Sequence, residues 1–591
     1  MFIKEIKKRN QGSDKIFIYH RLMESVRTPR GPRQRTILNL GQLELPRDEW
    51  KDLANRIEDI YMGQQSLFVS TPHIEELAQH YAQQLKRKEM HSVPVEQEVP
   101  DWERVDMNSL SQGESRSIGG EAISYNAFKK LGFPEILSDL GFSQWQIQQA
   151  ALLIIGRLIH PASERETVMW AKLISALDEL LGADFQHLSN NALYRLSDLL
   201  VRHRDEIERR LGERERTLFS LGEKIILYDL TNTYLEGNAR ESIKARHGRS
   251  KEKRRDCPLL TLALVLDEDG FPKASRIFPG NVSEPKTLKE MLLTLKRETG
   301  RLFNTSPTVV MDAGIATQEN LDLIREQGYH YICVSRSRPR EVPSNGLVVI
   351  KDDGVSVRAK KLDHGDEVLL YCESSGRVKK EEAMKNRFQK RFEEGLGAIA
   401  DSLNKKRGIK RYEKVIERLG RLRERYPSIA RFYHIDLQHK EGIVQKITWS
   451  IDEKEKLRTR FSGSYYVRST RLDLDEKELW SLYIMLTQVE DAFRSLKSEL
   501  GLRPIFHRKD HRMEGHLFIT VLAYHLLASI QRELKKKGLS YRWNTIRIQL
   551  ATQTRVRASI TNDKGERIHI RQTTDPEIFS SADLPCLGHS T

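Results

Sequence analysis

The sequence predicts a mixed α/β protein assembled from several structural units. Its 591 residues are enough for about four units of roughly 150 residues each. Between residues 221 and 335, short apolar runs and amphipathic segments follow one another in the order β-β-β-α-β-α-β. A content of 38% hydrophobic and 31% charged residues excludes collagen-like, low-complexity and wholly disordered chains.

The N-terminal region, residues 1–118, is predicted to hold a β-hairpin followed by helices. Its two β-like runs and two helical segments lie at 15–21, 35–40, 50–62 and 72–88. Basic residues dominate the turn-rich stretch Arg-Thr-Pro-Arg-Gly-Pro-Arg at 27–33, between the strands. The polar, proline-bearing segment at 90–102 indicates a linker to the rest of the chain.

Residues 119–220 are predicted to form a helical subdomain. The segment 144–159 is strongly apolar, and Ser163-Glu-Arg-Glu166 has the spelling of a capping box that starts the next helix. The apolar segment at 518–530 is too short to span a membrane, so we expect a buried helix there. Because the N-terminus has no apolar signal region and the four cysteines are scattered, we expect a reduced, intracellular protein without a membrane partner.

The first part of the predicted core, residues 221–335, places acids at the ends of two strands. Strands are expected at 225–229, 259–266, 274–278, 308–311 and 329–335, and helices at 285–295 and 318–326. Asp229 ends the first strand and Asp312 follows the fourth.

Residues 336–470 do not continue the order of strands and helices predicted for 221–335, and they are predicted to be an insertion. Its β-like runs, at 347–350, 367–371, 445–451 and 463–468, surround a very basic helical stretch at 377–431. The second part of the core, 471–550, is expected to contain one long helix at 476–500 and an apolar helix at 516–534. The polar tail at 551–591 is assigned no regular structure.

Three acids, Asp229, Asp312 and Glu490, form the candidate catalytic site. If the first and fourth strands are neighbours in the sheet, Asp229 and Asp312 face one another, and a helix packed beside them adds Glu490. Hard oxygen ligands suit Mg²⁺, with Mn²⁺ as a substitute, and two such ions can assist displacement at a phosphodiester. Each acid alone is a commonplace residue among 83 acidic ones, so the hypothesis rests on the joint pattern.

The helix that carries Glu490 has a polar stripe that suits a phosphate backbone. Tyr483, Glu490 and Lys497 are seven residues apart, about two helical turns, and Arg494 lies one turn past Glu490. This stripe predicts a metal ligand flanked by a phenol and two cations. The alternative is a surface helix with a Glu490–Arg494 ion pair, worth roughly 0.2–0.5 kcal/mol.

Three motifs resemble the DDE-type transposases of bacterial insertion sequences, in the branch with the signature Tyr-x2-Arg-x3-Glu-x6-Lys. Tyr-Asp-Leu-Thr at 228–231 is similar to that family's first-Asp strand, and Met-Asp-Ala-Gly at 311–314 to its second motif. Val-Glu-Asp-Ala-Phe-Arg-Ser-Leu-Lys at 489–497 is similar to its Glu helix, and the similarity covers about 220–530. Leu486 departs from the signature, which has Arg there, so one phosphate contact is missing; Arg494 is a candidate to supply the lost charge.

The resemblance implies an RNase H-like catalytic core interrupted by the β-rich insertion, with the N-terminal hairpin and helices as DNA-binding regions. It implies that Asp229, Asp312 and Glu490 bind two Mg²⁺ ions, and that Tyr483 and Lys497 hold the phosphate near the scissile bond. The implied partners are double-stranded DNA, as the terminal inverted repeats of the transposon and as target, and a second copy of the chain on the paired ends. The implied location is the nucleoid of a bacterial cytoplasm.

Positive charge supports a nucleic-acid partner. The chain has 98 Lys and Arg against 83 Asp and Glu, a net charge of +15. Near the first acid, the candidate phosphate contacts are Arg249, Lys251, Lys253, Arg254 and Arg255. Without the acids, solvated loops would be the preferred interpretation of this segment. His507 and His511 have zinc-like spacing without a third ligand in reach, and we expect a phosphate-contacting or solvated loop there.

The pattern favours a DNA transposase that cuts the 3′ ends of its element with metal-activated water and then joins the freed 3′ hydroxyl to target DNA. A metal-dependent nuclease without strand transfer would use the same acids, and the sequence does not separate the two. A non-catalytic basic DNA-binding protein is a third possibility, against which the intact acids argue.

Overall fold

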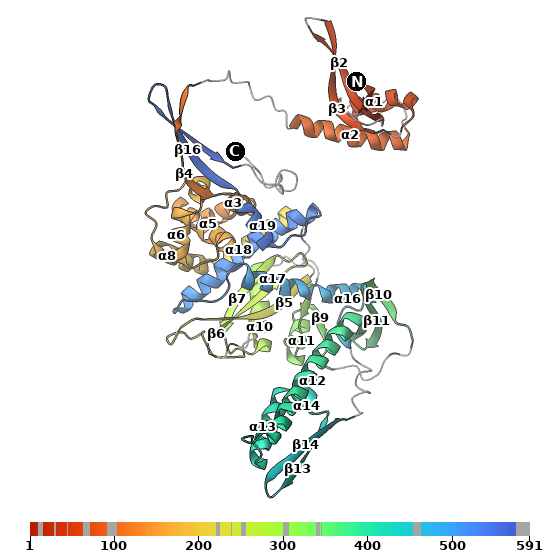
Figure 1. The fold of residues 1–591 in the computed structure, drawn as a ribbon, viewed down its shortest axis with the longest axis vertical. Coiled ribbons are helices and arrows are strands. Elements are labelled where there is room, and N and C mark those ends of the chain that lie inside the picture. The colour runs from red at the N-terminus through yellow and green to blue at the C-terminus, as the bar shows by residue number, and fades with distance from the viewer. Residues whose placement is uncertain are drawn as a thin grey trace. The chain divides into compact units, whose positions relative to one another are not determined.

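The computed structural model of the chain contains two compact units, each described by itself below (Figure 1). One unit comprises residues 1–108 with 561–567, and the other comprises the remainder. The described residues are 1–9, 16–28, 31–43, 45–62, 71–90, 103–219, 221, 225–237, 239–249, 254, 256–299, 306–337, 343, 345–452 and 463–574.

The N-terminal unit is a three-stranded antiparallel sheet with two helices packed on it. Its elements are β1 (Phe2–Arg9), β2 (Ile16–Thr28), β3 (Gly31–Gly41), η1 (Arg47–Glu49), α1 (Trp50–Met62) and α2 (Pro72–Met90). Leu22 from the sheet and Leu53 and Ile57 from α1 are fully buried in its core. The predicted hairpin and both helices are confirmed, whereas β1 was not expected. The predicted linker at 90–102 lies almost wholly outside the described residues.

Seven helices precede the central sheet in the second unit, and a later helix runs among them. They are α3 (Gly119–Lys130), α4 (Phe133–Asp139), α5 (Gln144–Ile159), α6 (Glu164–Leu173), α7 (Leu177–Leu181), α8 (Asn190–Arg202) and α9 (Arg204–Phe219). The later helix, α18 (Asp510–Lys536), packs against α3, α5 and α8 (Figure 1). By length and composition α18 could cross a membrane, but 94% of its most apolar window is buried inside the protein. It is a core helix, as predicted.

The central sheet has nine strands in the order β10-β11-β12-β15-β9-β8-β5-β6-β7. The expected order β-β-β-α-β-α-β is confirmed by β5 (Ile225–Tyr234), β6 (Leu259–Leu266), β7 (Pro272–Pro279), η2 (Glu284–Thr287), α10 (Leu288–Thr299), β8 (Thr308–Met311), α11 (Gln318–Glu326) and β9 (His330–Val334). β5 pairs antiparallel with β6 and parallel with β8, and β8 pairs parallel with β9. Leu288 and Leu321 of α10 and α11 are buried on one face of this sheet.

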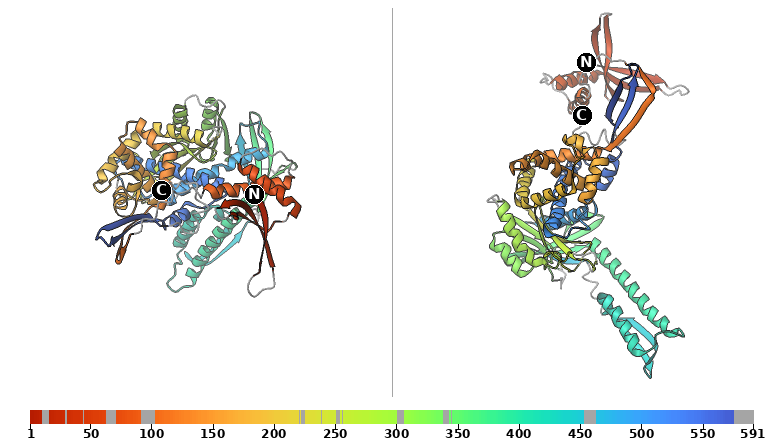
Figure 2. Two further views of the ribbon diagram at one scale, coloured as in Figure 1. Left: turned by 90° about the horizontal axis from the view of Figure 1, so that it is seen from above. Right: turned by 90° about the vertical axis from the view of Figure 1, so that its left-hand side faces the viewer.

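The segment predicted as an insertion contributes strands to the same sheet. β10 (Val348–Asp353), β11 (Val355–His364), β12 (Glu367–Ser374) and β15 (Ser464–Ser469) extend it beyond β9. Between β12 and β15 lies an excursion, 375–452, which we call the arm. It consists of α12 (Ser375–Asn404), α13 (Tyr412–Arg425), α14 (Pro427–Ala430), β13 (Tyr433–Lys440) and β14 (Ile443–Ile451). These elements lie side by side and enclose a small core of their own that includes Phe392, Val415 and Ile447 (Figure 2).

The prediction of one long helix at 476–500 is wrong. The structure has α16 (Glu476–Ile484) and α17 (Leu486–Ser498), separated at Met485. The amide of Met485 donates to the carbonyls of both Ser481 and Leu482, at 3.2 Å each, so the last turn of α16 tightens before α17 begins. The residues to either side have helical periodicity, which is why the sequence does not reveal the break.

The tail, for which the sequence predicts no particular structure, contains strands between 554 and 573. After α19 (Trp543–Leu550), β16 (Thr554–Asn562) and β17 (Arg567–Thr573) form a sheet with β4 (Val105–Ser117), in the order β17-β16-β4. An ion pair of 2.7 Å joins Arg557 to Glu114, which are 443 residues apart. Such polar strands carry little local signal, because each depends on a partner from the other end of the chain. Residues 575–591 lie outside the described part of the chain.

Candidate active site

Asp229 and Asp312 come from neighbouring strands, as predicted. β5 and β8 pair in a register that sets Tyr228 opposite Met311, and each aspartate is the next residue along. Tyr228 and Met311 are buried on the face covered by α10 and α11. Since side chains alternate along a strand, Asp229 belongs to the opposite face, and Asp312 follows directly at the end of the adjacent strand.

Backbone amides orient the two carboxylates. Leu230 N donates to Asp229 Oδ1, and Ala313 N donates to Asp312 Oδ1, each at 2.7 Å. Asp229 is half-buried and Asp312 is exposed. The loop after Asp312 is held by Arg336, whose Nε donates to the carbonyl of Ala313 at 2.8 Å. Asp312 thus stands on a turn that is tied to the end of β9, and its side chain reaches solvent.

Glu490 is carried by α17, which covers the face of the sheet to which Asp229 belongs. The buried residues of α17 are Val489, Ala492, Phe493 and Leu496, and they share a core with Leu227 of β5 and Leu262 of β6. Glu490 itself is exposed. The three predicted acids are therefore brought to the same face of the sheet by β5, β8 and α17.

Tyr483, at the end of α16, lies among these acids. Burial raises the pKa of Tyr483 to about 12; the guanidinium of Arg377 opposes the rise, and the carboxylates of Asp312 and Glu490 add to it. Because the charges of both carboxylates act on the Tyr483 phenol, Asp312 and Glu490 lie near the same side chain. Its own hydroxyl stays protonated at neutral pH.

The predicted stripe on the Glu490 helix is only partly present. The break at Met485 separates Tyr483 from Glu490 and Lys497, which both lie on α17. Lys497 is half-buried. The predicted alternative, a Glu490–Arg494 ion pair, is also not what the structure shows, because Arg494 Nη1 pairs with Asp491 Oδ1 at 2.5 Å.

The donor set suits a hard cation. Within the described ranges, no three His, Cys, Asp or Glu side chains are gathered closely enough to hold a metal ion. Asp229 and Asp312 still fit Mg²⁺, because that ion takes one or two protein carboxylates and completes its octahedron with water and substrate phosphate oxygens. Glu490 on α17 is exposed, and its charge, like that of Asp312, acts on Tyr483.

In the described part of the basic segment after β5, Arg254 is engaged in contacts within the protein. Arg254 pairs with Asp256 at 2.8 Å and Glu236 at 3.3 Å, and it lies 4.7 Å from the ring centroid of Tyr234. Arg249 is exposed. The other three predicted phosphate contacts of this segment, Lys251, Lys253 and Arg255, lie outside the described residues.

The same segment is tied down at two further points. Asp510, at the start of α18, accepts hydrogen bonds from the Ser242 hydroxyl and from the Ile243 amide. Gly248 lies so close to Gly280 that a Cβ on Gly248 would be 2.3 Å from the Gly280 carbonyl oxygen. Only glycine permits that approach, which explains why glycines stand in both stretches.

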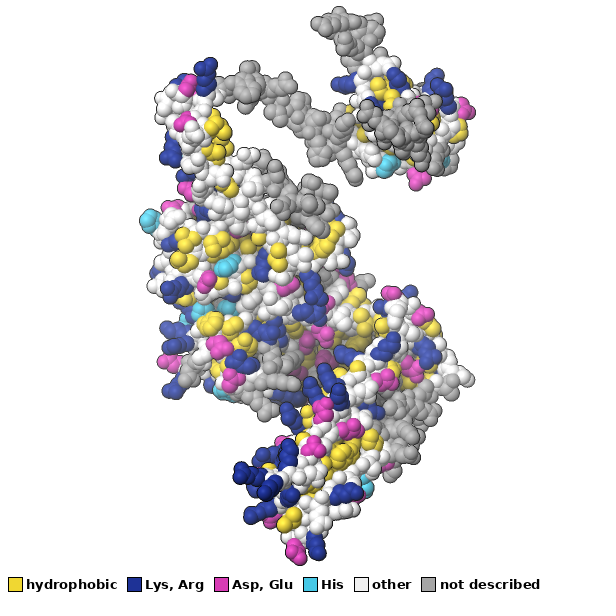
Figure 3. Space-filling model, in the orientation of Figure 1, with side chains coloured by type: hydrophobic (Ala, Val, Ile, Leu, Met, Phe, Trp, Pro, Cys, Tyr) yellow, Lys and Arg dark blue, Asp and Glu magenta, His cyan; other side chains and the backbone are white. Residues whose placement is uncertain are grey.

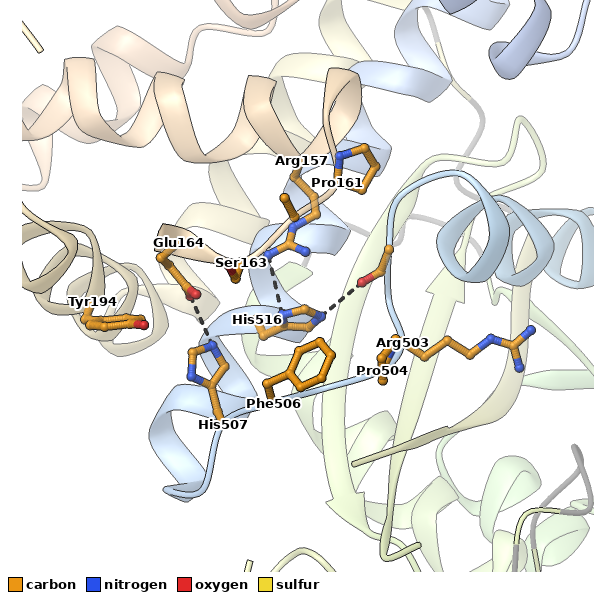
Figure 4. A pocket seen from close by; sticks show the side chains of 12 residues that line it. Arg157, Pro161, Ser163, Glu164, Tyr194, Arg503, Pro504, Phe506, His507 and His516 are labelled. Atoms are coloured by element: carbon orange, nitrogen blue, oxygen red, sulfur yellow. Dashed lines mark hydrogen bonds and ion pairs between the residues drawn. The ribbon is translucent and has the colours of Figure 1, made fainter. Parts of the chain in front are cut away.

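A cavity of about 190 Å³ lies between α5, α6 and the segment that follows α17 (Figure 4). Its walls include Arg157, Glu164, Tyr194, Phe506, His507 and His516. His507 Nε2 contacts Glu164 Oε1 at 3.1 Å, and Arg157 Nη2 lies 3.4 Å from His516 Nδ1. The expectation of a phosphate-contacting or solvated loop is wrong for His507, because this side chain is mostly buried against Glu164 and Tyr194.

Burial shapes the ionisation of this cluster. Burial alone would raise the pKa of Glu164, but the hydrogen bond and charge of His507, together with a backbone hydrogen bond and the Arg157 charge, lower the value to about 2. Burial, together with the Arg157 charge, lowers the pKa of His516 to about 3. The cavity therefore holds an ionised carboxylate and a neutral histidine at neutral pH.

Comparisons with known proteins give two family matches. The model of the transposase DDE domain matches residues 220–526, and that of the IS1634 family transposase N-terminal domain matches residues 3–67. No curated protein matches the chain. Among solved structures, a cryo-EM structure of a piggyBac transposase synaptic complex with hairpin DNA has a TM-score of 0.32 and 8% sequence identity, over 74% of this chain and 82% of that one. A similarity this low carries no argument about the present chain.

Proposed function

Because this chain belongs to the insertion-sequence transposases with a DDE domain, we propose that Asp229, Asp312 and Glu490 are its catalytic acids. The observation that carries the assignment is the register of β5 and β8, which makes Asp229 and Asp312 neighbours. The expectation that Asp229 ends its strand is wrong, because β5 continues to Tyr234 through its pairing with β6, whereas Asp312 directly follows β8. The proposed reaction is hydrolysis at the 3′ ends of the element, followed by attack of each 3′ hydroxyl on target DNA.

We assign the core to the RNase H-like class. The support is its strand order β7-β6-β5-β8-β9, in which three antiparallel strands are followed by two parallel ones. The strands β10, β11, β12 and β15 then extend this sheet, and the arm is inserted between the second and third acids.

The three carboxylates would hold two Mg²⁺ ions, whose chemistry when bound is to activate the attacking oxygen and stabilise the leaving oxygen. The amide-bound oxygens of Asp229 and Asp312 fix the direction of both carboxylates before DNA arrives. Tyr483, protonated at neutral pH, can donate a hydrogen bond to a phosphate oxygen, and Lys497 adds a positive charge on α17.

We propose that double-stranded DNA is held by several parts of the chain. The N-terminal unit, within the proposed region 1–118, would recognise the terminal repeats, and the arm and the segment with Arg249 would contact phosphates. Figure 3 shows Lys and Arg side chains gathered over the α13 part of the arm. The proposed active form is a homodimer on paired ends, working on DNA in the bacterial cytoplasm.

The test is an assay with a labelled duplex carrying the element's own end, a supercoiled target and Mg²⁺. We expect joined products that Asp312→Asn lowers by roughly 1000-fold, while Asp322→Asn, an exposed aspartate on α11, changes little. Cutting without joining would indicate a nuclease. Binding with neither reaction, in Mn²⁺ as well, would overturn the catalytic assignment and leave a DNA-binding protein.

A further inference from the structure

We propose that Arg377, in the first turn of the arm helix α12, binds the DNA phosphate next to the catalytic acids. This inference rests on the proposed function and adds a substrate-contacting residue that the motifs do not contain. Arg377 lies 113 residues before Glu490 in the chain, inside the segment that the sequence predicts as an insertion.

The start of α12 is fixed over the sheet by β12 and β15. These strands pair with Cys372 opposite Tyr465, and α12 begins three residues after Cys372. The side chain of Ser374 caps the helix by accepting a hydrogen bond from Arg377 N at 3.4 Å. Arg377 is thus held by a strand end and a cap, both of which belong to the central sheet.

An aromatic cluster connects Arg377 to Tyr483. The guanidinium carbon of Arg377 is 4.7 Å from the Tyr465 ring centroid, within the range of a cation–π contact. The Tyr465 and Tyr483 ring centroids are 6.0 Å apart, and Trp480 Nε1 donates to the Tyr465 hydroxyl at 3.1 Å. Three ring systems therefore form a continuous patch with the guanidinium at one end and the catalytic-site phenol at the other.

Charges of both signs act on the phenol of Tyr483. The carboxylates of Asp312 and Glu490 raise the pKa of Tyr483, and Arg377 lowers it. The guanidinium and two proposed catalytic acids therefore all act on one side chain. Arg377 is thus a positive group from which a phosphate drawn to ions at the acids can gain a contact.

Arg377 is available for a ligand. Its side chain is 42% exposed, and Glu381, with which it forms an ion pair at 3.0 Å, is 40% exposed. An exposed i,i+4 pair of this kind is weak, so a phosphate can replace the carboxylate. A planar guanidinium can also bind two phosphate oxygens at once, which a lysine cannot.

The sequence offered a different residue for this role. Position 486 is Leu, and the candidate replacement Arg494 pairs with Asp491 on the exposed side of α17, whereas Arg377 contacts the aromatic cluster that includes Tyr483. Arg377 supplies a cation beside Tyr483 from a different element. No motif could have identified it, because its position depends on the pairing of β12 with β15.

The experiment compares Arg377→Ala and Arg377→Gln with Arg358→Ala in the full-length protein. Arg358 is a matched control, since it is 53% exposed and forms a comparable ion pair with Glu373 at 2.8 Å. We expect both Arg377 variants to lower the rate of end cleavage about 30- to 100-fold, with less than about a tenfold loss in affinity for end DNA. Arg358→Ala should stay within about twofold of the wild type.

A second arm of the experiment identifies the phosphate. A set of end duplexes is prepared, and each duplex carries a single neutral methylphosphonate at one of the positions flanking the scissile bond. At one of these positions, the methylphosphonate should slow the wild type by the same factor as the Arg377→Ala substitution slows cleavage of unmodified DNA. The same methylphosphonate should not slow the Arg377→Ala variant any further. The proposal would be overturned if both Arg377 variants cleaved at the wild-type rate. It would also be overturned if, at every position, the effect of the methylphosphonate and the effect of the Arg377→Ala substitution multiplied. If the wild type itself does not cut, the proposed function fails and not only this inference.

Discussion

At the scale of single residues, the neighbours of a side chain decide its role. Arg254 belongs to a strongly basic segment of the chain, yet it pairs with Asp256 and Glu236. His507 has a zinc-like spacing in sequence, yet it contacts Glu164 in a cavity. Residue type and spacing identify candidates in both cases, and the contacts show which candidates are already engaged.

His516 makes the fold sensitive to acid. Burial lowers its pKa from 6.5 to about 3, so between these values the unfolded chain binds a proton that the folded chain does not. The contribution of His516 to the free energy of unfolding is fully present above pH 6.5 and is lost as the pH falls toward 3. From pH 7 to pH 5 we expect a loss of about 1–2 kcal/mol, seen as a lower Tm by tryptophan fluorescence.

His516→Gln should remove most of that pH dependence, although it lowers stability at pH 7. The same drop in Tm between pH 7 and pH 5 in the variant would show that other groups cause the acid sensitivity.

Tyr483 should assist cleavage as a neutral hydrogen-bond donor. We expect Tyr483→Phe to slow end cleavage about tenfold, because one hydrogen bond to a charged phosphate is lost. Since burial raises the pKa of Tyr483 to about 12, the wild-type rate should show no tyrosine ionisation up to pH 10. Single-turnover rates across this pH range provide the measurement; a Phe variant as fast as the wild type would contradict the role.

At the scale of elements, local pattern predicts where helices and strands lie, but not how they end or which charges they bury. α9 and α18 illustrate this. Glu215 on α9 and His525 on α18 meet at 2.5 Å, with both side chains fully buried. The sequence shows only one acid in a charged helix and one histidine in an apolar helix.

Removing one member of this buried pair should be costly. We expect Glu215→Ala to lower the free energy of unfolding by about 3 kcal/mol, because His525 loses its partner inside the core. Glu213→Ala is the matched control on the same helix: Glu213 is 40% exposed and pairs with Arg209, so its loss should cost under about 1 kcal/mol. Urea unfolding by circular dichroism measures both, and equal costs would contradict the argument.

At the scale of the whole molecule, the arm is a separable element. It has a core of its own, and the Gly463 amide donates to Glu381 at 3.0 Å, which brings the start of β15 next to the second turn of α12. Residues 385–452 contain 17 Lys and Arg against nine Asp and Glu. This excess of positive charge suits a DNA backbone.

Replacing 385–452 by a short Gly-Ser linker should spare the sheet and weaken DNA binding. We expect the Tm of the remainder to change by only a few degrees, and the dependence of log Kd on log salt to become less steep by at least about one unit. Fluorescence anisotropy with end DNA between 50 and 200 mM salt provides the measurement. An unchanged salt dependence would show that the arm does not contact phosphates.

The sequence by itself determined the order of the core elements, that Asp229 lies on the first strand and Asp312 directly after the fourth, that Glu490 lies on a helix, and the buried state of α18. It did not determine that β5 continues past Asp229 or that the helix breaks at Met485. Each of these is encoded in a few consecutive residues, by periodicity or by a motif. The tertiary structure alone decided that β10, β11, β12 and β15 extend the central sheet, that polar β4 and β16 pair, and that Arg377 stands beside Tyr483. Those features depend on partners about 100 to more than 400 residues away, and backbone pairing over such distances leaves no pattern in the local sequence.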